Sequence, residues 1–183
     1  LMWYGSSQGR NMSVFPNAQM LYPAAGVMVL LLVTKKKEEV PRRFFISYLI
    51  TTVLMIGCAV GSAFTDDAMV WVGMTNLVLI FGSIVCGILM LTEKREKRSA
   101  CGLKGQKWGA SVFCILLFAV LYLLRQVIAC IMAGEPSAFT SVLADPMTWY
   151  LLVVVLINYV FVFIAFFGEE YGWRYFLQPM LQK

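Results

Sequence analysis

Five long runs without a charged side chain dominate this chain of 183 residues. The runs cover residues 11–34, 44–65, 68–92, 108–124 and 146–168. A helix needs about 20 apolar residues to cross the hydrocarbon core of a bilayer. Four runs reach this length, and the run from 108 reaches it if its helix continues past Arg125. The pattern predicts an all-α fold, a polytopic membrane helix bundle with five transmembrane helices near 15–34, 44–64, 68–92, 108–133 and 147–168.

The composition agrees with a membrane protein, because 60% of the residues are hydrophobic and only 14% are charged. A soluble domain has roughly a quarter charged residues. We expect a single transmembrane domain over residues 1–183, since no segment reads as a linker. The first span is the weakest of the five, because polar residues and prolines interrupt it at Pro16, Asn17, Gln19 and Pro23.

The basic residues follow the loops between the predicted helices. Loop 35–43 holds five lysines and arginines and loop 93–107 holds six, whereas loops 65–67 and 134–146 hold none. Short loops rich in lysine and arginine stay in the cytoplasm. We therefore predict that the two basic loops and Glu169 are cytoplasmic and that the other two loops are extracytoplasmic. The net charge of +5 is thus a topology signal, aided by anionic membrane lipid, and does not indicate a nucleic-acid partner.

Several other residues bear on packing. Small residues four apart let helices approach closely in lipid. Such pairs occur at Gly57 with Gly61 and at Ser83 with Gly87. Asp145 and Pro146 suit the N-cap and first turn of the fifth helix.

The five cysteines show no C-x-x-C spacing, so we interpret them as small apolar residues and not as a zinc or disulfide framework.

Arg125 is the one charge inside a predicted span. It could contact an ion or a substrate, or it could extend toward the outer surface or bond to a neighbouring helix. We favour the second role, because no acidic residue lies at matching depth. Asn76 and Asn158 are expected to form interhelical hydrogen bonds.

Glu169, Glu170 and Arg174 form a charged cluster at the end of the last run. On a helix of about 100° per residue, Glu170 and Arg174 share a face at the favourable i, i+4 spacing. Glu169 lies apart from that pair, at the edge of a stripe containing Gly168 and Gly172, where another helix can come close. We therefore predict that Glu169 faces a tight intramembrane cavity, as suits a general base. The alternative is that the three charges mark the water interface.

The segment G-E-E-Y-G-W-R-Y-F-L-Q-P-M-L-Q, residues 168–182, resembles the first motif of the CPBP family, the CAAX proteases and bacteriocin-processing enzymes. That motif is E-E-x-x-x-R at the cytoplasmic side of a helix, and Glu169, Glu170 and Arg174 match its defining positions. Frequent accompaniments of the motif are present at Gly168, Gly172, Trp173, Phe176, Leu177, Pro179 and Leu181. Tyr175 stands where a glycine is frequent, and the rest of the chain agrees only in general character.

The resemblance implies an intramembrane metallo-endopeptidase of all-helical fold in the plasma membrane of a bacterium. Glu169 would activate the water that attacks a peptide bond, and Glu170 and Arg174 would support and orient the site. The implied substrates are membrane-associated peptides or proteins, such as prenylated C-terminal peptides and leader peptides. The implied cofactor is a divalent metal, zinc, bound by histidines of later motifs.

Those later motifs, F-x-x-x-H and H-x-x-x-N/D, are absent from this chain, which contains no histidine. We therefore expect no metal ligands in this chain, histidine ligands beyond Lys183, and no activity from the chain alone. Leu1 and Lys183 look like arbitrary ends, so we expect a segment of a longer protease. A degenerate relative is the alternative, although it would have no obvious reason to keep the carboxylates.

Two other classes of function stay open. A non-catalytic membrane protein, such as an immunity or scaffold factor, would still lack histidines in its full reading frame. A small transporter or channel would use Arg125 and Asn158 to line a path, so that Arg125→Ala removes function and Glu169→Ala does not. The substrate and the oligomeric state do not follow from the sequence.

Overall fold

The computed structural model describes residues 2–7, 10, 12–36, 38–65, 67–103 and 108–182. It is 86% helical, and the described residues form no strand. The helices long and apolar enough to cross a membrane are Val14–Thr34, Arg42–Phe64, Met69–Thr92 and Val112–Met132. A fifth crossing is counted if a bent pair of helices over residues 137–161 acts as one span. The predicted all-α membrane fold is confirmed. Of the loop and terminal residues considered above, Leu1, Lys37, Asp66, 104–107 and Lys183 lie outside the described residues.

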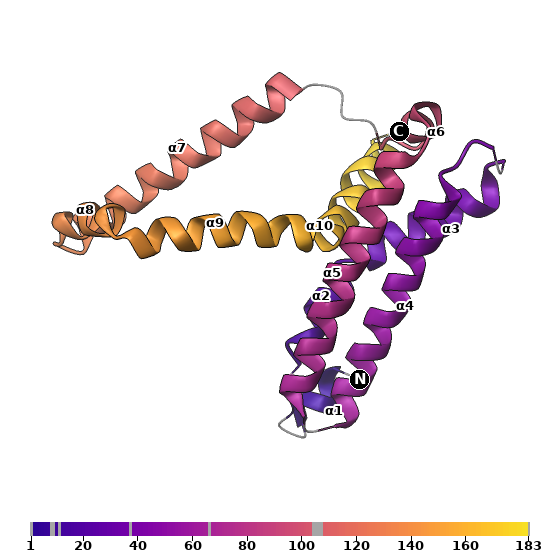
Figure 1. Ribbon diagram of the computed structural model, residues 1–183, viewed down its shortest axis with the longest axis horizontal. Helices are drawn as coiled ribbons and strands as arrows, with labels where there is room; N and C mark the ends of the chain where they lie inside the picture. The colour runs from indigo at the N-terminus through magenta and orange to yellow at the C-terminus, as the bar shows by residue number, and fades with distance from the viewer. Residues whose placement is uncertain are drawn as a thin grey trace. The chain divides into compact units, whose positions relative to one another are not determined.

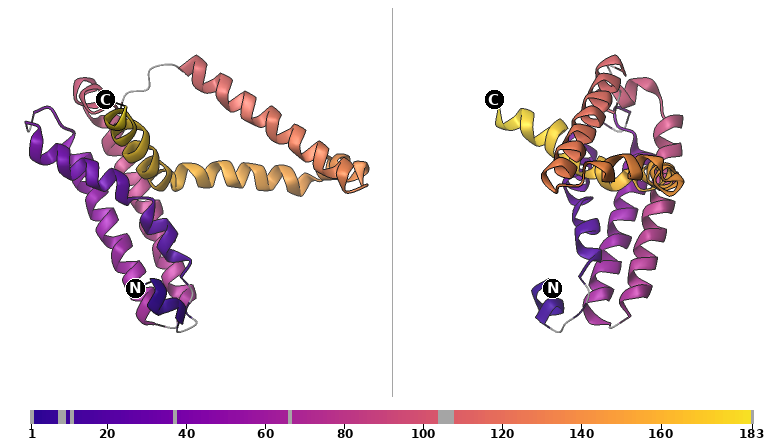
Figure 2. Two further views of the ribbon diagram at one scale, coloured as in Figure 1. Left: turned by 180° about the vertical axis from the view of Figure 1, so that it is seen from behind. Right: turned by 90° about the vertical axis from the view of Figure 1, so that its left-hand side faces the viewer.

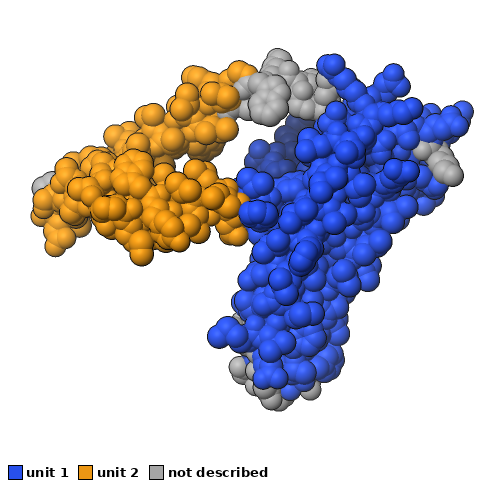
Figure 3. All heavy atoms as spheres, in the orientation of Figure 1, with its two compact units in different colours: residues 1–103, 159–183 blue, residues 104–158 orange. Residues whose placement is uncertain are grey.

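The chain divides into two compact units, which Figure 3 colours separately. Unit 1 contains residues 1–103 and 159–183, and unit 2 contains residues 104–158. The helices of unit 1 are α1 (Met2–Ser7), α2 (Val14–Gln19), α3 (Tyr22–Thr34), α4 (Arg42–Phe64), α5 (Ala68–Thr92), α6 (Arg95–Ala100), α10 (Phe163–Glu170), the π-helix η1 (Tyr171–Leu177) and α11 (Gln178–Leu181). Unit 2 holds α7 (Trp108–Met132), α8 (Pro136–Ala144) and most of α9 (Pro146–Phe161).

Helices α4 and α5 form the centre of unit 1, where they lie side by side and antiparallel (Figures 1 and 2). Gly82 on α5 receives the side chain of Thr51, and Gly61 on α4 receives the ring of Trp71. A Cβ atom at either glycine would collide with that partner, so the close approach predicted around Gly61 is confirmed. Gly57 instead faces open space. The largest buried side chains of the pair are Phe44, Phe45, Tyr48 and Met55.

The first span is interrupted between α2 and α3. Helix α2 ends at Gln19, four residues before Pro23. Proline has no N–H to donate to the carbonyl of Gln19, and its ring collides with that carbonyl, so a continuous helix cannot form. Helix α3 restarts at Tyr22 with Pro23 in its first turn, a position that tolerates proline. The carbonyl of Leu21 at the break accepts a hydrogen bond from the buried hydroxyl of Tyr48 at 3.2 Å.

The last span, predicted as one helix over 147–168, is interrupted at Val162, between α9 and α10. A helix break in an apolar span leaves backbone groups that need other partners. Here the buried N–H of Ile164 donates to the hydroxyl oxygen of Ser83 on α5 at 3.4 Å. Gly87, one turn after Ser83, lies against the ring of Phe163. The predicted small pair on α5 therefore packs against the start of α10.

Unit 2 contains a helix where the sequence suggested only a loop. Residues 134–146 include the nine-residue helix α8, which begins at Pro136 and meets α9 at a bend of 68°. Asp145 lies at the bend, and its carboxylate oxygen accepts the N–H of Met147 at 3.0 Å. Pro146 is the first residue of α9, so the predicted N-cap and first-turn proline are confirmed. Arg125 on α7 is exposed, as are Asn158 on α9 and, in unit 1, Asn76 on α5.

Candidate functional site

The glycine stripe beside the acidic motif packs tightly against the break in the first span. A Cβ at Gly168 would collide with the carbonyl oxygen of Met20 and with the Tyr48 hydroxyl. A Cβ at Gly172 would collide with Pro23 and with the backbone that follows it. Only glycine lets two backbones come this close. The predicted close approach of another helix is therefore confirmed, and the partner is the Met20–Pro23 turn.

A column of aromatic rings also holds the same segment in place. Phe167, Tyr171 and Tyr175 stack along α10 and η1, with centroids 5.1 Å apart at both steps. Phe167 also meets the rings of Phe44 and Tyr48 edge-on, at 5.7 and 6.0 Å. Aromatic pairs in these geometries stabilise a contact beyond the area they bury. The motif segment is thus held to α4 as well as to α3.

Glu170 and Arg174 form the ion pair that their spacing predicted. Nε of Arg174 lies 2.8 Å from a carboxylate oxygen of Glu170. Both side chains are largely exposed, at 75% for Arg174 and 53% for Glu170. An exposed i, i+4 pair contributes only about 0.3–0.5 kcal/mol to stability. Its value therefore lies in orienting the two charges and not in holding the fold.

Glu169 does not occupy the tight cavity predicted for it. Its side chain is exposed, and among the described residues no lysine or arginine lies within ion-pair distance of it. The physical reason is that residues Met20–Pro23 pack directly against Gly168 and Gly172, where the cavity was expected. The side chain of Glu169 lies beside that packed face and is exposed.

The motif does not continue as a regular α-helix. Residues Tyr171–Leu177, which include Arg174, form a π-helix, and the N–H of Gln178 bonds to the carbonyl of Trp173, five residues earlier. Such wide turns are rare in proteins and occur frequently at functional sites. The predicted helix over residues 147–168 and its continuation did not include this widening.

The motif lies at the same end of unit 1 as both basic loops. The Tyr171 hydroxyl donates to the carbonyl of Cys101, just after α6, at 2.9 Å. The thiol of Cys101 lies 3.8 Å from the carbonyl of Glu39, and Nζ of Lys35 donates to the carbonyl of Ala100 at 2.9 Å. Figures 1 and 2 show the C-terminal segment and α6 toward the same end of unit 1, and the N-terminus at the far end of α4. Glu169 therefore lies toward the same end of unit 1 as residues 35–36, 38–43 and 93–103.

An apolar groove of about 410 Å³ adjoins the motif on the α3 side. Its walls include Tyr22 and Gly26 from α3 and Trp173 and Phe176 from η1. Trp173 is half-exposed and lies one turn after Glu169. The Glu169 carboxylate therefore lies about one helical turn from a groove that suits apolar side chains.

The described residues of this chain do not form a metal site. The described part of the chain contains no group of three or more histidines, cysteines, aspartates or glutamates that could hold an ion, and the whole sequence lacks histidine. A structural or catalytic zinc needs at least three such protein ligands. Glu169 and Glu170 alone do not meet that requirement, so we assign no step to a metal.

No family model, curated protein or solved structure matches this chain. The family resemblance of residues 168–182 stands on the motif alone. Tyr171 and Cys101 were not among the predicted site residues, although they connect the motif to the basic loop. Phe167, Tyr171 and Tyr175 are spaced four residues apart, and this spacing predicts that their rings share one face of the helix.

Proposed function

We propose that this chain carries the first catalytic motif of an intramembrane endopeptidase of the plasma membrane of a bacterium. Its Glu169 carboxylate would activate a water molecule for hydrolysis of a peptide bond in a membrane-associated peptide or protein. One observation carries the proposal: two adjacent glutamates with different environments. Glu170 is paired with Arg174, and Glu169 is unpaired among the described residues and accessible.

The different environments match different chemical roles. A general base must accept a proton from water, and a carboxylate already held by a guanidinium is less able to do so. Glu169 is free for that step, whereas Glu170 holds Arg174 at a defined place on the same helix. Arg174 can then orient a carbonyl or carboxylate group of a substrate.

The step is a hydrolysis in which Glu169 takes a proton from water while the water oxygen attacks the carbonyl carbon. The peptide C–N bond then breaks, and the proton held by Glu169 passes to the leaving amine. A base must keep its geometry to be effective. The contacts of Gly168 and Gly172 with the Met20–Pro23 turn supply that rigidity on either side of Glu169.

The groove between α3 and η1 supports an apolar, membrane-embedded substrate. It has almost no polar lining, and it is bounded by Trp173, one turn from Glu169. A peptide with an apolar stretch or a covalently attached lipid would place that part in the groove and its peptide bond toward the carboxylate. Prenylated peptides and leader peptides both have this character.

A non-catalytic membrane scaffold is the second candidate, and the exposure of Glu169 favours it. Catalytic sites commonly exclude bulk water around the reacting groups. The described residues leave the Glu169 carboxylate open, as an interaction surface would.

The test compares the complete reading frame containing Glu169→Gln with the unchanged protein in bacterial membranes. New peptide N-termini in the membrane proteome are identified by mass spectrometry. We expect a set of termini that depends on Glu169 and persists in Glu96→Gln, a matched loss of one exposed glutamate on α6. Equal membrane levels of all three proteins are verified by immunoblot. Identical termini from the unchanged protein and Glu169→Gln would rule out the protease and leave the scaffold.

A further inference from the structure

A charged groove of about 730 Å³ opens where α4 begins and α5 ends. Its charged walls are Arg42, Arg43, Lys94, Lys97, Glu38 and Glu93. Leu89 and Thr92, from the last turns of the membrane helix α5, complete the lining. The groove therefore lies at the boundary between the apolar span and the basic loops.

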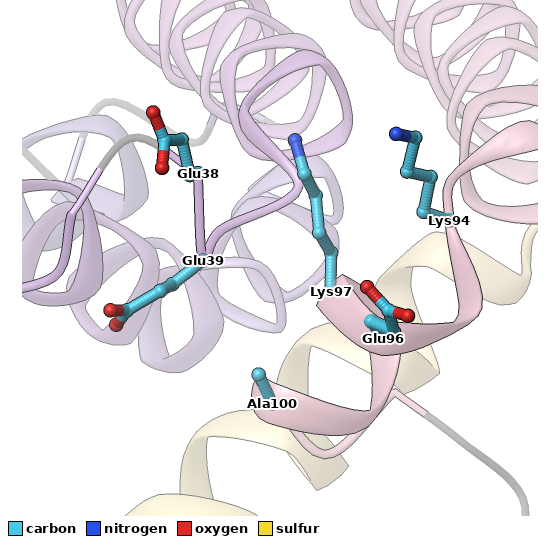
Figure 4. A pocket seen from close by; sticks show the side chains of 6 residues that line it. All are labelled: Glu38, Glu39, Lys94, Glu96, Lys97 and Ala100. Carbon is cyan, nitrogen blue, oxygen red and sulfur yellow. The ribbon is translucent and has the colours of Figure 1, made fainter.

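The groove keeps a net positive charge, because four cations line it against the two carboxylates of Glu38 and Glu93. Lys97 is 3.9 Å from Glu93, which accounts for one cation. Within the described residues, Arg42, Arg43 and Lys94 have no carboxylate at ion-pair distance, and all three side chains are exposed. Figure 4 shows an adjoining cavity that shares three of these walls, Glu38, Lys94 and Lys97, with the ammonium groups of the two lysines extending to the same side. An anion between the two loops would meet several cations at once.

The start of α4 adds to this field. Its first turn contains Arg42 and Arg43 and no acidic residue. The N-terminus of a helix carries roughly half a positive charge, which repels cations placed there and attracts anions. Two adjacent arginines at this position are therefore unfavourable for the isolated chain and become favourable when an anionic group lies between them.

An exposed apolar stripe continues from the arginines into the membrane. Ile46, Ile50 and Val53 lie on the same face of α4 as Arg42, and their side chains are 49%, 55% and 66% exposed. With Leu49 and Leu54 they form a shallow, almost wholly apolar groove. Val53 lies about 16 Å along the helix from Arg42 at 1.5 Å per residue, roughly half the thickness of the hydrocarbon core.

We propose that this surface is a binding site for an anionic phospholipid. Its phosphate would lie among Arg42, Arg43 and Lys94, and one acyl chain would follow Ile46, Ile50 and Val53. Basic pockets between membrane helices on the cytoplasmic side bind anionic headgroups in this way. The cations alone would also suit free phosphate, but the apolar stripe gives only the lipid a second set of contacts. The inference is independent of the proposed protease activity.

The test measures lipid binding to the purified protein in a mild detergent by native mass spectrometry, with dioleoylphosphatidylglycerol and dioleoylphosphatidylcholine as probes. A surface cation contributes about 1 kcal/mol to binding of an anionic lipid, so we expect a preference on the order of tenfold for phosphatidylglycerol. The variant Arg42→Gln/Lys94→Gln removes one charge from each loop and should reduce this preference to about twofold or less.

The matched control is Lys36→Gln/Arg95→Gln, which also removes one exposed charge from each loop but alters no wall of the groove. It should keep the preference. A loss equal to that of Arg42→Gln/Lys94→Gln would show that only overall charge matters and would overturn the proposal. No preference in the unchanged protein would also overturn it.

A second variant separates the lipid from free phosphate. Ile46→Ser/Ile50→Ser changes two exposed side chains of the stripe and leaves the cations intact. We expect weaker binding of phosphatidylglycerol and no effect on binding of inorganic phosphate. Undiminished phosphatidylglycerol binding, together with full competition by inorganic phosphate at equal concentration, would assign the groove to free phosphate and refute the lipid site.

Discussion

The hydroxyl of Tyr171 donates a hydrogen bond to the backbone carbonyl of Cys101, 2.9 Å away and 70 residues earlier in the chain. Tyr171 directly follows Glu170, and the Cys101 thiol lies 3.8 Å from the carbonyl of Glu39. One buried cysteine therefore connects the acidic motif with both basic loops. These contacts fix Tyr171, and with it the segment that carries Glu169, against residues of both loops.

Tyr171→Phe tests that connection. The variant keeps the ring stack with Phe167 and Tyr175 but leaves the buried carbonyl of Cys101 without its hydroxyl donor. A lost bond of this kind costs about 1–3 kcal/mol. We expect a lower midpoint of thermal unfolding in detergent. Tyr175→Phe removes a hydroxyl from the adjacent, less buried ring and should have a smaller effect; equal effects would contradict the role of the Tyr171 bond.

The same contact makes the fold sensitive to alkaline pH. Burial raises the pKa of the Cys101 thiol. The positive charge of Lys35 opposes this rise, and the negative charge of Glu39 adds to it. Burial, with Cys101 and Tyr175, also raises the pKa of the Tyr171 phenol. Because the unfolded chain releases these protons at lower pH than the folded chain, stability is complete below the unfolded values and falls as pH rises above them.

We therefore expect the thermal midpoint to stay level up to about pH 8 and to fall between about pH 8.5 and 10.5, the range in which free thiols and phenols ionise. Cys101→Ala and Tyr171→Phe should each make that decrease shallower. A decrease of unchanged slope in both variants would show that other groups cause it.

Gly168→Ala tests the contact between the motif and the broken first span. The new Cβ would meet the carbonyl of Met20 and the hydroxyl of Tyr48, and a backbone atom cannot move aside cheaply. Overpacking of this kind costs about 1–3 kcal/mol. Gly26→Ala on α3 is the control, since nothing lies within 4 Å of its Cβ position. The Gly168 variant should unfold at a lower temperature than the control; the reverse order would contradict the close approach.

The charge distribution predicts the orientation of the chain in the membrane. A reporter inserted after Lys97 should be active only as a cytoplasmic fusion, and a reporter in residues 134–146 only as an external one. Because Tyr171 bonds to the residue that follows α6, the reporter after Lys97 also locates Glu169. An external Lys97 would place the acidic motif outside the cell and contradict the predicted cytoplasmic location of Glu169.

The spans with charged residues at both ends were the easiest to predict. Helix α5 covers Ala68–Thr92, the same residues as the predicted third span, because acidic and basic residues bound that apolar run. Helix α4 begins at Arg42, two residues before its prediction, since a charged residue at a membrane edge can still be helical. Pro23 indicated that the first span is weak. The position of the break follows from the residue four places before it, Gln19, where α2 ends.

Other features depend on partners distant in the sequence. The break at Val162 is compatible with lipid because Ser83 accepts the N–H of Ile164, and nothing near Val162 indicates this. The helical wheel identified the Glu170–Arg174 pair and the packed glycine stripe correctly. It misplaced Glu169, because a wheel does not show how completely a neighbouring backbone fills the space beside that stripe. The catalytic role of Glu169 stays a prediction.

The contact of Gly168 with the Met20–Pro23 turn joins the first long helix to the last one, about 150 residues later in synthesis. A ribosome adds about 5–20 residues per second, so the first helix waits on the order of ten seconds in the membrane before its partner is made. During that interval the backbone at its break lacks the cover that Gly168 and Gly172 later provide. Insertion of the helix that carries the motif therefore completes the packing of the first span as well as that of the last. In a nascent chain halted before Gly168, the backbone at Met20 would lack this contact.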